Sequence, residues 1–462
     1  MHWMVPTSMI LLALAGTRAV EAAAASPVRC EVGSYALADG TKVDIADRGE
    51  GQLRWRLLDG RTGVLTPQGK DRWTSKLGWA DRADGHQFSF DCKSGEIRFD
   101  KLKGRREALT QIDTRFQGSG VELAGRLTLP PGQARVPIVV LIHGAEHSSA
   151  LEDYSLQRQF ASVGIGVFAY DKRGTGASAG RYSQNYLVLA TDAIHALREA
   201  KRLAGDRAGR IGYQGGSQGG WVAPLAAQIE PVDFVILSFG LAVSPLDEDR
   251  EAIEFDMQRA GFGPEIQAKA REIAEVTAKI VESNFTEGYQ ELDAVKRKYG
   301  NEPWFKAVRG NFTWYLLAGT EEQIRKEGPP LLEGVPARYD PMPVLTNLDV
   351  PQLWILGGQD RDAPPMETLR RLDALSKAGR PITAAVFPGA DHGMYEFETQ
   401  ADGERVSTRQ PDGYVQMMKD FIEGKPRAAG YGNAEMRVSG PWLTERQSPA
   451  GSATTRPPTP RP

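Results

Sequence analysis

A serine enclosed by four glycines is the residue of this sequence best suited to covalent chemistry. Ser217 lies in RIGYQGGSQGGW, residues 210–221, and forms a G-x-S-x-G pentapeptide with Gly215 and Gly219. An apolar run precedes it and a helical pattern follows it. This context predicts a nucleophile elbow, in which side chains at Gly215 and Gly219 would collide with the adjoining strand and helix. An ordinary tight turn is the alternative.

A serine hydroxyl is a poor nucleophile until a base takes its proton. The sequence contains six histidines, so the base can be sought by elimination. Five lie in segments with a different expected role, such as an export signal, a β domain, a helix or a supporting loop: His2, His86, His143, His147 and His195. His392 is left, in FPGADHGM directly after the last predicted strand. A surface loop histidine is the alternative.

The base needs a carboxylate to orient its second nitrogen. The loop ILGGQDRDAPP supplies Asp360 and Asp362. Asp360 is preferred because it comes first after the strand, and Asp362 is kept as the alternative. Asp391, beside the histidine, is interpreted as a turn former. The resulting order is Ser217, Asp360, His392, the order known from one large class of serine hydrolases.

Charge that develops on a carbonyl oxygen needs two preorganised N–H donors. One predicted donor is the backbone N–H of Gln218, directly after the serine. The second is expected from HGAEH, where the chain leaves another strand, and Ala145 is preferred over Glu146. His143 and His147 are expected to support that loop.

Short apolar runs alternate with amphipathic helical patterns over most of the chain after residue 113. The runs cover residues 138–142, 164–170, 210–214, 233–239, 352–356 and 382–387. Near-continuous apolar strands between helices predict a mostly parallel sheet with helices on both faces. Helical patterns over 243–349 interrupt this alternation and predict a cap. The cap's aromatic cluster is either an apolar substrate pocket or the cap's own core.

The part of the chain before residue 113 has a different residue pattern. Three Asp-Gly pairs, at residues 39–40, 59–60 and 84–85, separate short alternating segments and predict hairpins of a small antiparallel β domain. Cys30 and Cys92 are the only cysteines, and a single disulfide is preferred over two free thiols. The apolar run at residues 9–16, followed by small residues, predicts an export signal and a periplasmic or extracellular location.

The predicted domains follow from these changes of pattern. They are a signal peptide at 1–25, a small β domain at 28–113, a catalytic domain at 114–242 and 350–425, a helical cap at 243–349 and a largely disordered tail at 426–462. A net charge of −3 with interspersed signs gives no indication of a nucleic-acid partner, and the apolar run is too short for a membrane span.

Five segments in this order resemble the α/β-hydrolase superfamily: VVLIHGAEHS, FAYDKRGTGASAG, IGYQGGSQGGWVAPLAA, ILGGQDRDAPP and FPGADHGM. They are most similar to exported bacterial esterases and to serine aminopeptidase-like hydrolases related to dipeptidyl aminopeptidases and acylaminoacyl-peptidases. The resemblance covers about residues 114–425. It implies that residues 171–178 shape a loop near the floor of the site. The chain lacks room for the large propeller that gates peptide entry in prolyl-oligopeptidase-type enzymes.

The resulting hypothesis is a serine hydrolase that cleaves carboxylic esters through an acyl-enzyme. An amidase or small-peptide peptidase with the same residues is the alternative, with Glu251 and Glu254 available for a peptide amino terminus. A catalytically inactive binding module is a third possibility. The expected partner is a small ester or short peptide, and no cofactor or metal is expected, since the sequence lacks a metal-ligand cluster and a P-loop ending.

Overall fold

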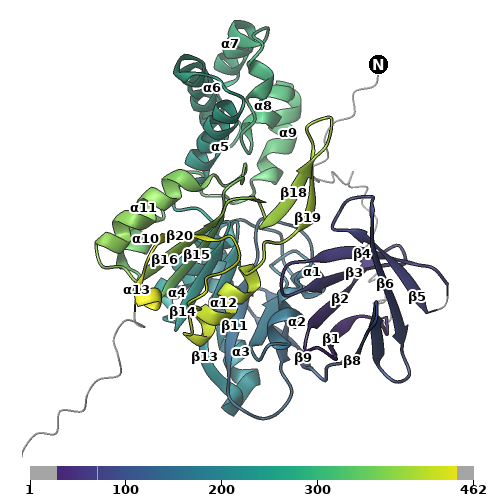
Figure 1. Cartoon of the computed structure of the whole chain (residues 1–462). Coiled ribbons are helices and arrows are strands. Elements are labelled where there is room, and N and C mark those ends of the chain that lie inside the picture. The colour runs from purple at the N-terminus through teal and green to yellow at the C-terminus, as the bar shows by residue number, and fades with distance from the viewer. Residues whose placement is uncertain (1–28, 70, 445–462) are drawn as a thin grey trace, which may run out of the picture. The chain divides into compact units, whose positions relative to one another are not determined.

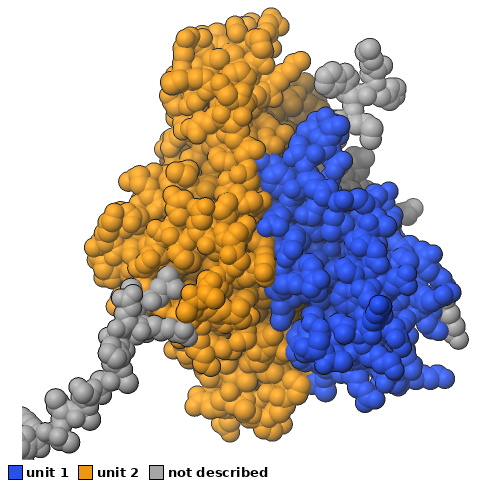
Figure 2. All heavy atoms as spheres, viewed as in Figure 1, with its two compact units in different colours: residues 1–108, 395–410 blue, residues 109–394, 411–462 orange. Residues whose placement is uncertain are grey.

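The computed structural model describes residues 29–69 and 71–444, which fall into two compact units (Figure 1). Unit 1 comprises residues 1–108 and 395–410, and unit 2 comprises residues 109–394 and 411–462 (Figure 2). The predicted signal peptide at 1–25 lies outside the described residues. No helix in the described part of the chain is both long and apolar enough to span a membrane.

Eight antiparallel strands of unit 1 close into a barrel, because β1 pairs with both β2 and β8. The strands are β1 Gly33–Leu37, β2 Lys42–Gly49, β3 Gln52–Leu57, β4 Thr62–Pro67, β5 Arg72–Leu77, β6 Ala83–Asp91, β7 Glu96–Phe99 and β8 Leu102–Arg106. Alternating side chains fill the interior, as expected for strands with one buried face. Trp55 and Trp73 are the largest of them, at 1% and 4% exposed.

Two of the three predicted Asp-Gly hairpins form. Gly40 (φ 87°) and Gly60 (φ 91°) adopt the left-handed backbone that such turns need, between β1 and β2 and between β3 and β4. The third prediction was wrong, because Asp84 and Gly85 lie inside β6, where the register with β5 shifts. Asp84 accepts a hydrogen bond from the Ser75 hydroxyl there. Gly85 (φ 86°) therefore serves an irregular strand rather than a turn.

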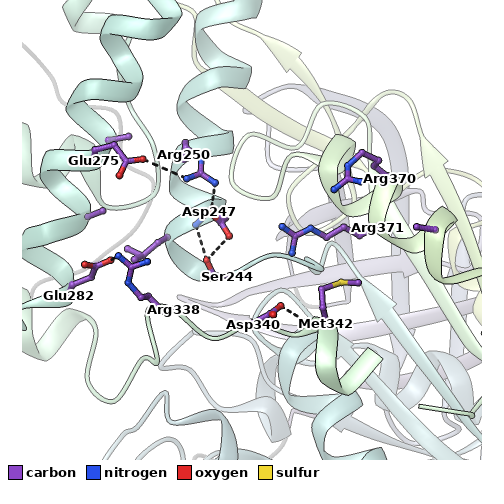
Figure 3. A pocket seen from close by; sticks show the side chains of 14 residues that line it. Ser244, Asp247, Arg250, Glu275, Glu282, Arg338, Asp340, Met342, Arg370 and Arg371 are labelled. Carbon is purple, nitrogen blue, oxygen red and sulfur yellow. Dashed lines mark hydrogen bonds and ion pairs between the residues drawn. The ribbon is translucent and has the colours of Figure 1, made fainter. Parts of the chain in front are cut away.

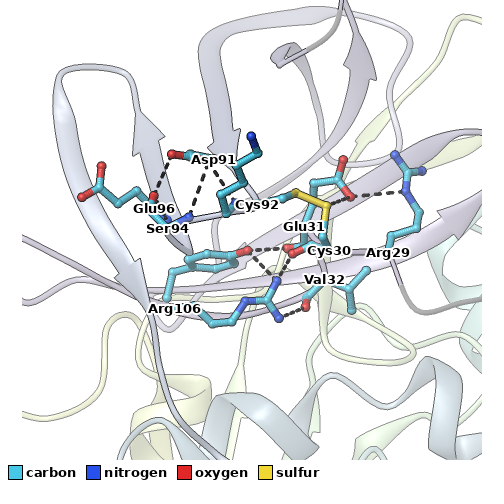
Figure 4. Close-up of a disulfide and its surroundings, with 11 residues drawn as sticks. Arg29, Cys30, Glu31, Val32, Asp91, Cys92, Ser94, Glu96 and Arg106 are labelled. Atoms are coloured by element: carbon cyan, nitrogen blue, oxygen red, sulfur yellow. Dashed lines mark hydrogen bonds and ion pairs between the residues drawn. A yellow bond between two sulfur atoms is a disulfide. The ribbon is translucent and has the colours of Figure 1, made fainter.

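The predicted disulfide between Cys30 and Cys92 is present in unit 1 (Figure 4). It joins the segment before β1 to the turn between β6 and β7, with Cα atoms 5.6 Å apart. Arg106 secures the same segment, since its guanidinium donates to the carbonyl of Val32 at 2.6 Å and to that of Cys30. The N-terminal edge of the barrel is thus fixed covalently and by hydrogen bonds.

Unit 1 also contains a hairpin from much later in the chain, formed by β18 Tyr395–Thr399 and β19 Arg405–Arg409. The Tyr395 ring packs edge-on against Trp79 at 4.6 Å between centroids, and the N–H of Trp79 donates to the carbonyl of Ser407 at 2.9 Å. A Cβ atom at Gly78 would lie 2.3 Å from the carbonyl oxygen of Thr408. Barrel and hairpin are therefore in direct backbone contact.

A nine-stranded sheet forms the centre of unit 2, in the order β20-β16-β15-β14-β13-β11-β12-β10-β9. Its strands are β9 Thr110–Gln117, β10 Glu122–Leu129, β11 Val136–Ile142, β12 Gly166–Tyr170, β13 Ala208–Gly216, β14 Phe234–Ser238, β15 Gln352–Gly357, β16 Ile382–Phe387 and β20 Glu435–Val438. The strands β11 to β16 pair in parallel and match the six predicted runs. The edge strands β9 and β20, and β10 next to β9, pair antiparallel with their neighbours.

Both faces of this sheet are covered, since every residue of β12, β14, β15 and β16 is buried. The remaining elements around it are α1 Ala150–Asp153, α2 Leu156–Ala161, α3 Tyr186–Ala204, η1 Gly205–Arg207, α4 Gly219–Ile229, α10 Met342–Asn347, α11 Pro365–Lys377, β17 Ala390–Asp391, α12 Tyr414–Glu423 and α13 Pro441–Thr444. This mostly parallel α/β arrangement confirms the predicted fold class. β20 lies within the segment 426–462 that was expected to be largely disordered.

Apart from α10, the helices between β14 and β15 gather at one end of unit 2 (Figure 1). They are α5 Pro245–Arg259, α6 Pro264–Glu282, α7 Tyr289–Tyr299, η2 Phe305–Ala307, α8 Thr313–Ala318 and α9 Glu321–Leu331. These helices, hereafter the cap, have a hydrophobic core of their own. A buried carboxylate fastens it: Asp249 accepts the N–H of Phe312 at 2.8 Å and the hydroxyl of Thr313 at 2.6 Å.

Candidate active site

Ser217 occupies the sharp turn between β13 and α4, where its backbone has a φ of 51°. This left-handed conformation is uncommon for a residue with a side chain and is typical of functional sites. The glycines make the turn possible. A Cβ atom at Gly215 would lie 2.5 Å from the carbonyl oxygen of Gly219, and one at Gly219 would lie 3.1 Å from that of Ile142. The collisions expected from the sequence are thus collisions with backbone.

Ser217, His392 and Asp360 are brought into one hydrogen-bonded line. The Nε2 atom of His392 lies 3.1 Å from the Oγ atom of Ser217. Its Nδ1 atom lies 3.0 and 3.1 Å from the two carboxylate oxygens of Asp360. A serine, an imidazole and a carboxylate in this order can move a proton from the hydroxyl to the ring.

Each partner of Ser217 is held by its own loop. Asp360 is completely buried after β15, where it accepts the N–H groups of Asp362 at 3.0 Å and Ala363 at 2.8 Å. Asp362, the alternative acid, thus interacts with Asp360 through its backbone N–H, which donates to the Asp360 carboxylate. His392 follows β17, and its ring packs edge-on against Phe239 with the centroids 5.0 Å apart.

The pKa values of the imidazole and its carboxylate are coupled. Burial raises the pKa of Asp360, and the facing imidazole opposes that effect. Burial also disfavours the protonated ring of His392, but the carboxylates of Asp360, Asp362 and Glu248 outweigh it and raise the pKa of His392 above its usual range. The imidazole is therefore a stronger base than an exposed histidine.

Two backbone N–H groups near Ser217 are free to bind an anion. Within the described residues, the N–H of Gln218 and that of Ala145 donate to no carbonyl or side chain. The loop bearing Ala145 is close to the serine, because a Cβ atom at Gly144 would lie 3.5 Å from that of Ser217. The residues expected to supply an oxyanion hole are thus both available as donors.

His143 and His147 contact the surroundings of that loop, as the sequence suggested. The Nε2 atom of His143 lies 3.0 Å from the N–H of Lys172, and its Nδ1 atom lies 3.1 Å from the carboxylate of Glu146. His147 stacks on Tyr182 with the ring centroids 3.7 Å apart. Burial alone would raise the pKa of Glu146, but His143 and Lys172 lower it to about 2.

The segment 171–178 has a structural role in these contacts. Asp171 accepts the hydroxyl of Ser149 at 2.7 Å and the N–H of Ala177 at 2.8 Å. Gly176 passes so close that a Cβ atom there would lie 2.1 Å from the Asp171 carboxylate. Lys172, which follows Asp171, is buried beside the loop that carries Ala145. No role near the site was predicted for this residue from the sequence.

The cap contacts the loop that carries Asp360. Arg361 forms an ion pair with Asp256 of α5 at 2.8 Å, and the side chain of Asn311 donates to the carbonyl of Asp362 at 2.9 Å. Most of the aromatic cluster of the cap belongs to the cap's own core, since Phe305, Phe312 and Tyr315 pack against it. Trp304 is 3% exposed and belongs to the cap core, whereas Trp314 is 44% exposed.

The acids proposed for a peptide amino terminus are not the ones that influence His392. Glu254 pairs with Arg271 at 3.3 Å, and burial together with Glu367 and Asp247 raises the pKa of Glu251 to about 8. Glu248, in the first turn of α5, instead interacts electrostatically with the site histidine. Periodicity could not distinguish these glutamates, since all three lie on one helix.

A cavity of about 620 Å³ lies between the cap and α11 (Figure 3). It is lined by charges of both signs, contributed by Arg250, Arg338, Arg370, Arg371, Asp247, Glu275, Glu282 and Asp340. Several of them pair with one another, as Arg338 does with Glu282. None of the three residues in the Ser217 line borders this cavity, and its balanced charge favours no class of ligand.

Comparisons with known proteins agree with this architecture. The family model described as the alpha/beta hydrolase family matches residues 139–406. A search of curated proteins finds no match.

A comparison with solved structures finds a Pyrococcus horikoshii acylaminoacyl peptidase, at 16% identity and a TM-score of 0.42, covering 84% of this chain and 57% of that one. A Pyrococcus furiosus esterase has 15% identity, covering 62% and 84% of the two chains, with a TM-score of 0.38. An acetyl xylan esterase from Paenibacillus has 18% identity, covering 69% and 85%, with a TM-score of 0.38.

The chain thus spans little more than half of the length of the similar acylaminoacyl peptidase. At these identities and TM-scores the likeness carries no argument about this chain. The family match covers more than half of the chain and includes the strands and loops that carry Ser217, Asp360 and His392. The chain belongs to the alpha/beta hydrolase family.

Proposed function

We propose that the protein is a serine hydrolase that cleaves carboxylic esters. The supporting observation is the continuous line from the hydroxyl of Ser217 through His392 to the buried carboxylate of Asp360. The carboxylate of Asp360 accepts a hydrogen bond from the Nδ1–H of His392, which leaves Nε2 free to act as the base.

In the first half-reaction, the Oγ atom of Ser217 attacks the ester carbonyl while its proton moves to Nε2 of His392. The carbonyl oxygen becomes an oxyanion, which the N–H groups of Gln218 and Ala145 bind. The tetrahedral centre collapses, the C–O bond to the alcohol breaks, and the imidazolium gives its proton to the departing oxygen. An acyl-serine remains.

In the second half-reaction, water attacks the acyl-serine and gives a proton to His392. The bond between the acyl carbon and the Oγ atom of Ser217 breaks, and the imidazolium returns its proton to the serine. A carboxylic acid leaves and the enzyme is restored. All proton transfers use Nε2, so the orientation set by Asp360 serves both half-reactions.

The decisive experiment follows hydrolysis of p-nitrophenyl butyrate by the full-length protein and by S217A. We expect turnover by the wild type and its loss in the variant, because the nucleophile is absent. T191A, which changes an exposed threonine hydroxyl of α3, is the matched control. If S217A and the wild type hydrolyse the ester at equal rates, the proposed nucleophile is wrong.

An amidase or small-peptide peptidase is the second candidate, and Glu248 favours it. Burial raises the pKa of this carboxyl, the charges of Asp362 and Asp360 act in the same direction, and His392 opposes them. A cation bound beside it would favour the charged form. A carboxylate at this position could pair with the amino group of a peptide. Hydrolysis of leucine p-nitroanilide, with a KM raised in E248Q while the KM for the butyrate ester is unchanged, would support this candidate over the esterase.

We also propose that the protein acts outside the cytoplasm. The disulfide between Cys30 and Cys92 supports this location, because such bonds persist in oxidising compartments. The apolar segment at residues 9–16 supports export. Fractionation of cells that produce the full chain tests the location, and recovery of the protein from the cytoplasm alone would contradict it.

A further inference from the structure

Lys172 is a buried cation beside the loop that carries the proposed oxyanion donor Ala145. Its residue is 2% exposed, and its ammonium donates to the carbonyl oxygen of Gly144 at 2.8 Å. The ammonium also lies 4.5 Å from the centroid of the Tyr182 ring. Burying an ammonium is unfavourable unless its surroundings compensate the charge. The carbonyl, the ring and the charge of Glu146 compensate it here.

The carbonyl that Lys172 contacts belongs to the same peptide unit as the N–H of Ala145. This unit is trans, as are the other described peptide bonds. In a planar trans peptide the C=O and the N–H point in opposite directions. An ammonium fixed on the Gly144 oxygen therefore fixes the direction of the Ala145 N–H. It also draws electron density toward the oxygen, which strengthens the N–H as a donor.

The neighbouring peptide groups are anchored as well. The hydroxyl of Tyr182 donates to the carbonyl of Ala145 at 2.5 Å. The N–H of Gly144 donates to the Tyr154 hydroxyl at 3.3 Å. The N–H groups of Ala145 and Glu146 donate to no other described residue, and that of Ala145 belongs to the peptide unit whose oxygen Lys172 contacts. The loop is thus held at its oxygens while this donor is left available.

We propose that Lys172 is a positioning residue that orients and polarises the Gly144–Ala145 peptide for oxyanion binding. This inference rests on the proposed serine hydrolase function. The developing oxyanion would gain most from the oriented donor in the transition state, and the bound ester would gain little. Loss of the ammonium should therefore lower kcat and leave KM nearly unchanged.

The charge of Lys172 also gives a pH signature. Burial lowers the pKa of Lys172 to about 8, and Glu146 partly opposes that effect. The ammonium is charged below this pH and loses its charge above it, so kcat should fall as the pH rises through about 8.

The groups around the ammonium titrate elsewhere. The pKa of Glu146 is lowered to about 2, burial raises the pKa values of Tyr154 and Tyr182, and burial and Lys172 lower that of His147. The backbone N–H of Lys172 donates to the Nε2 atom of His143. The pKa of Glu251 on α5 is also raised to about 8, so loss of the fall near pH 8 on replacing Lys172 is what assigns it to the ammonium.

The test compares the wild type with K172M, K172Q and the surface control K201M by steady-state hydrolysis of p-nitrophenyl butyrate between pH 6 and pH 9.5. We expect kcat of K172M to fall roughly 10- to 100-fold, below the full effect of deleting an oxyanion donor. KM should stay within about twofold, and the fall near pH 8 should disappear. K172Q retains an N–H donor without the charge, so it should lose the pH signature but keep more of kcat.

The outcomes separate this inference from the proposed function. A folded K172M with wild-type kcat, or one with only a raised KM, overturns the role of Lys172 while the esterase stands. If K172M fails to fold, the pH profile of K172Q decides, and a profile that matches the wild type overturns the inference. A wild type without esterase activity overturns both.

Discussion

Within the described residues, a histidine–aspartate pair lies in each of the two units. In unit 1 the Nδ1 atom of His86 lies 2.8 Å from a carboxylate oxygen of Asp100. In unit 2 the same atom of His392 lies 3.0 Å from Asp360. The two imidazole side chains are equally accessible, at 29% and 27%, but the carboxylates differ, at 41% exposed for Asp100 and 0% for Asp360.

The two histidines also differ in what surrounds the rest of the imidazole ring, beyond the nitrogen that faces the aspartate. His392 faces the hydroxyl of Ser217, whereas the ring of His86 packs edge-on against Trp55 and Phe99 in the barrel. Left-handed backbone does not separate the two, since Asp100 and Ser217 both have it, with φ of 52° and 51°. Under the proposed function, contact between histidine and aspartate alone is therefore insufficient for catalysis. A buried acid and a nucleophile within reach of the other nitrogen make the difference.

The largest effect on kcat is expected when the pair formed by His392 and Asp360 is broken. D360N should lower kcat about 10⁴-fold, because an amide no longer holds the tautomer in which Nε2 is the base. D100N is the matched substitution in unit 1 and should leave kcat unchanged. Steady-state kinetics of both variants measure the contrast. Equal effects of the two substitutions would mean that the burial of the acid has no catalytic consequence.

The same variant should change the acidic limb of the pH profile. His392 must be neutral to accept a proton, so activity is lost as the pH falls through the pKa of His392. The Asp360 carboxylate helps to raise that pKa. In D360N the limb should therefore move to lower pH. The dependence of kcat/KM on pH between 5 and 10 measures this shift, and a limb that stays in place would contradict the assigned coupling.

A smaller and different effect is expected in unit 1, on stability rather than on chemistry. The disulfide separates Cys30 and Cys92 by 62 positions, and closing a loop of that length stabilises a fold by about 4 kcal/mol. The double variant C30S/C92S should lose about that amount in denaturant unfolding followed by tryptophan fluorescence. Its kcat under native conditions should stay at the wild-type value. The reduced wild type is the control, and a stable double variant would show that the barrel needs no covalent support.

The smallest effect is expected at the pair formed by His86 and Asp100 in unit 1. H86Q should change kcat by less than twofold and the free energy of unfolding by about 1 kcal/mol or less, because exposed ion pairs contribute little. H392Q, the matched change, should be inactive. Thermal melts and ester hydrolysis of the two variants make the comparison. If H86Q were also inactive, the distinction drawn between the two pairs would fail.

The residues of the candidate site could be proposed from sequence because each has a local signature. Ser217 lies in a glycine-rich turn between a strand and a helix, and the scarcity of histidines left His392. The parallel strands were recognised because strands buried on both faces are continuous apolar runs. The choice of Asp360 over Asp362 rested on position alone, and its complete burial is visible only in three dimensions.

Other features depend on contacts that no local pattern encodes. Closure of the barrel joins β1 to β8, and β9 and β10 alternate too weakly to stand out from the loops around them. The role inferred for Lys172 depends on a carbonyl 28 residues away in the chain. Glu248, Glu251 and Glu254 share one helix, and only the direction in which each side chain points separates their roles.

The hairpin of β18 and β19 has a consequence for folding of the chain during its synthesis on the ribosome. The barrel strands are translated first, yet the residues that cover Gly78 and Trp79 emerge only after β9 to β17 have been made. During synthesis the surface at Gly78 and Trp79 therefore stays uncovered until nearly the whole chain has been made. A gene truncated before residue 395 would therefore encode an incomplete first unit, although every barrel strand is present.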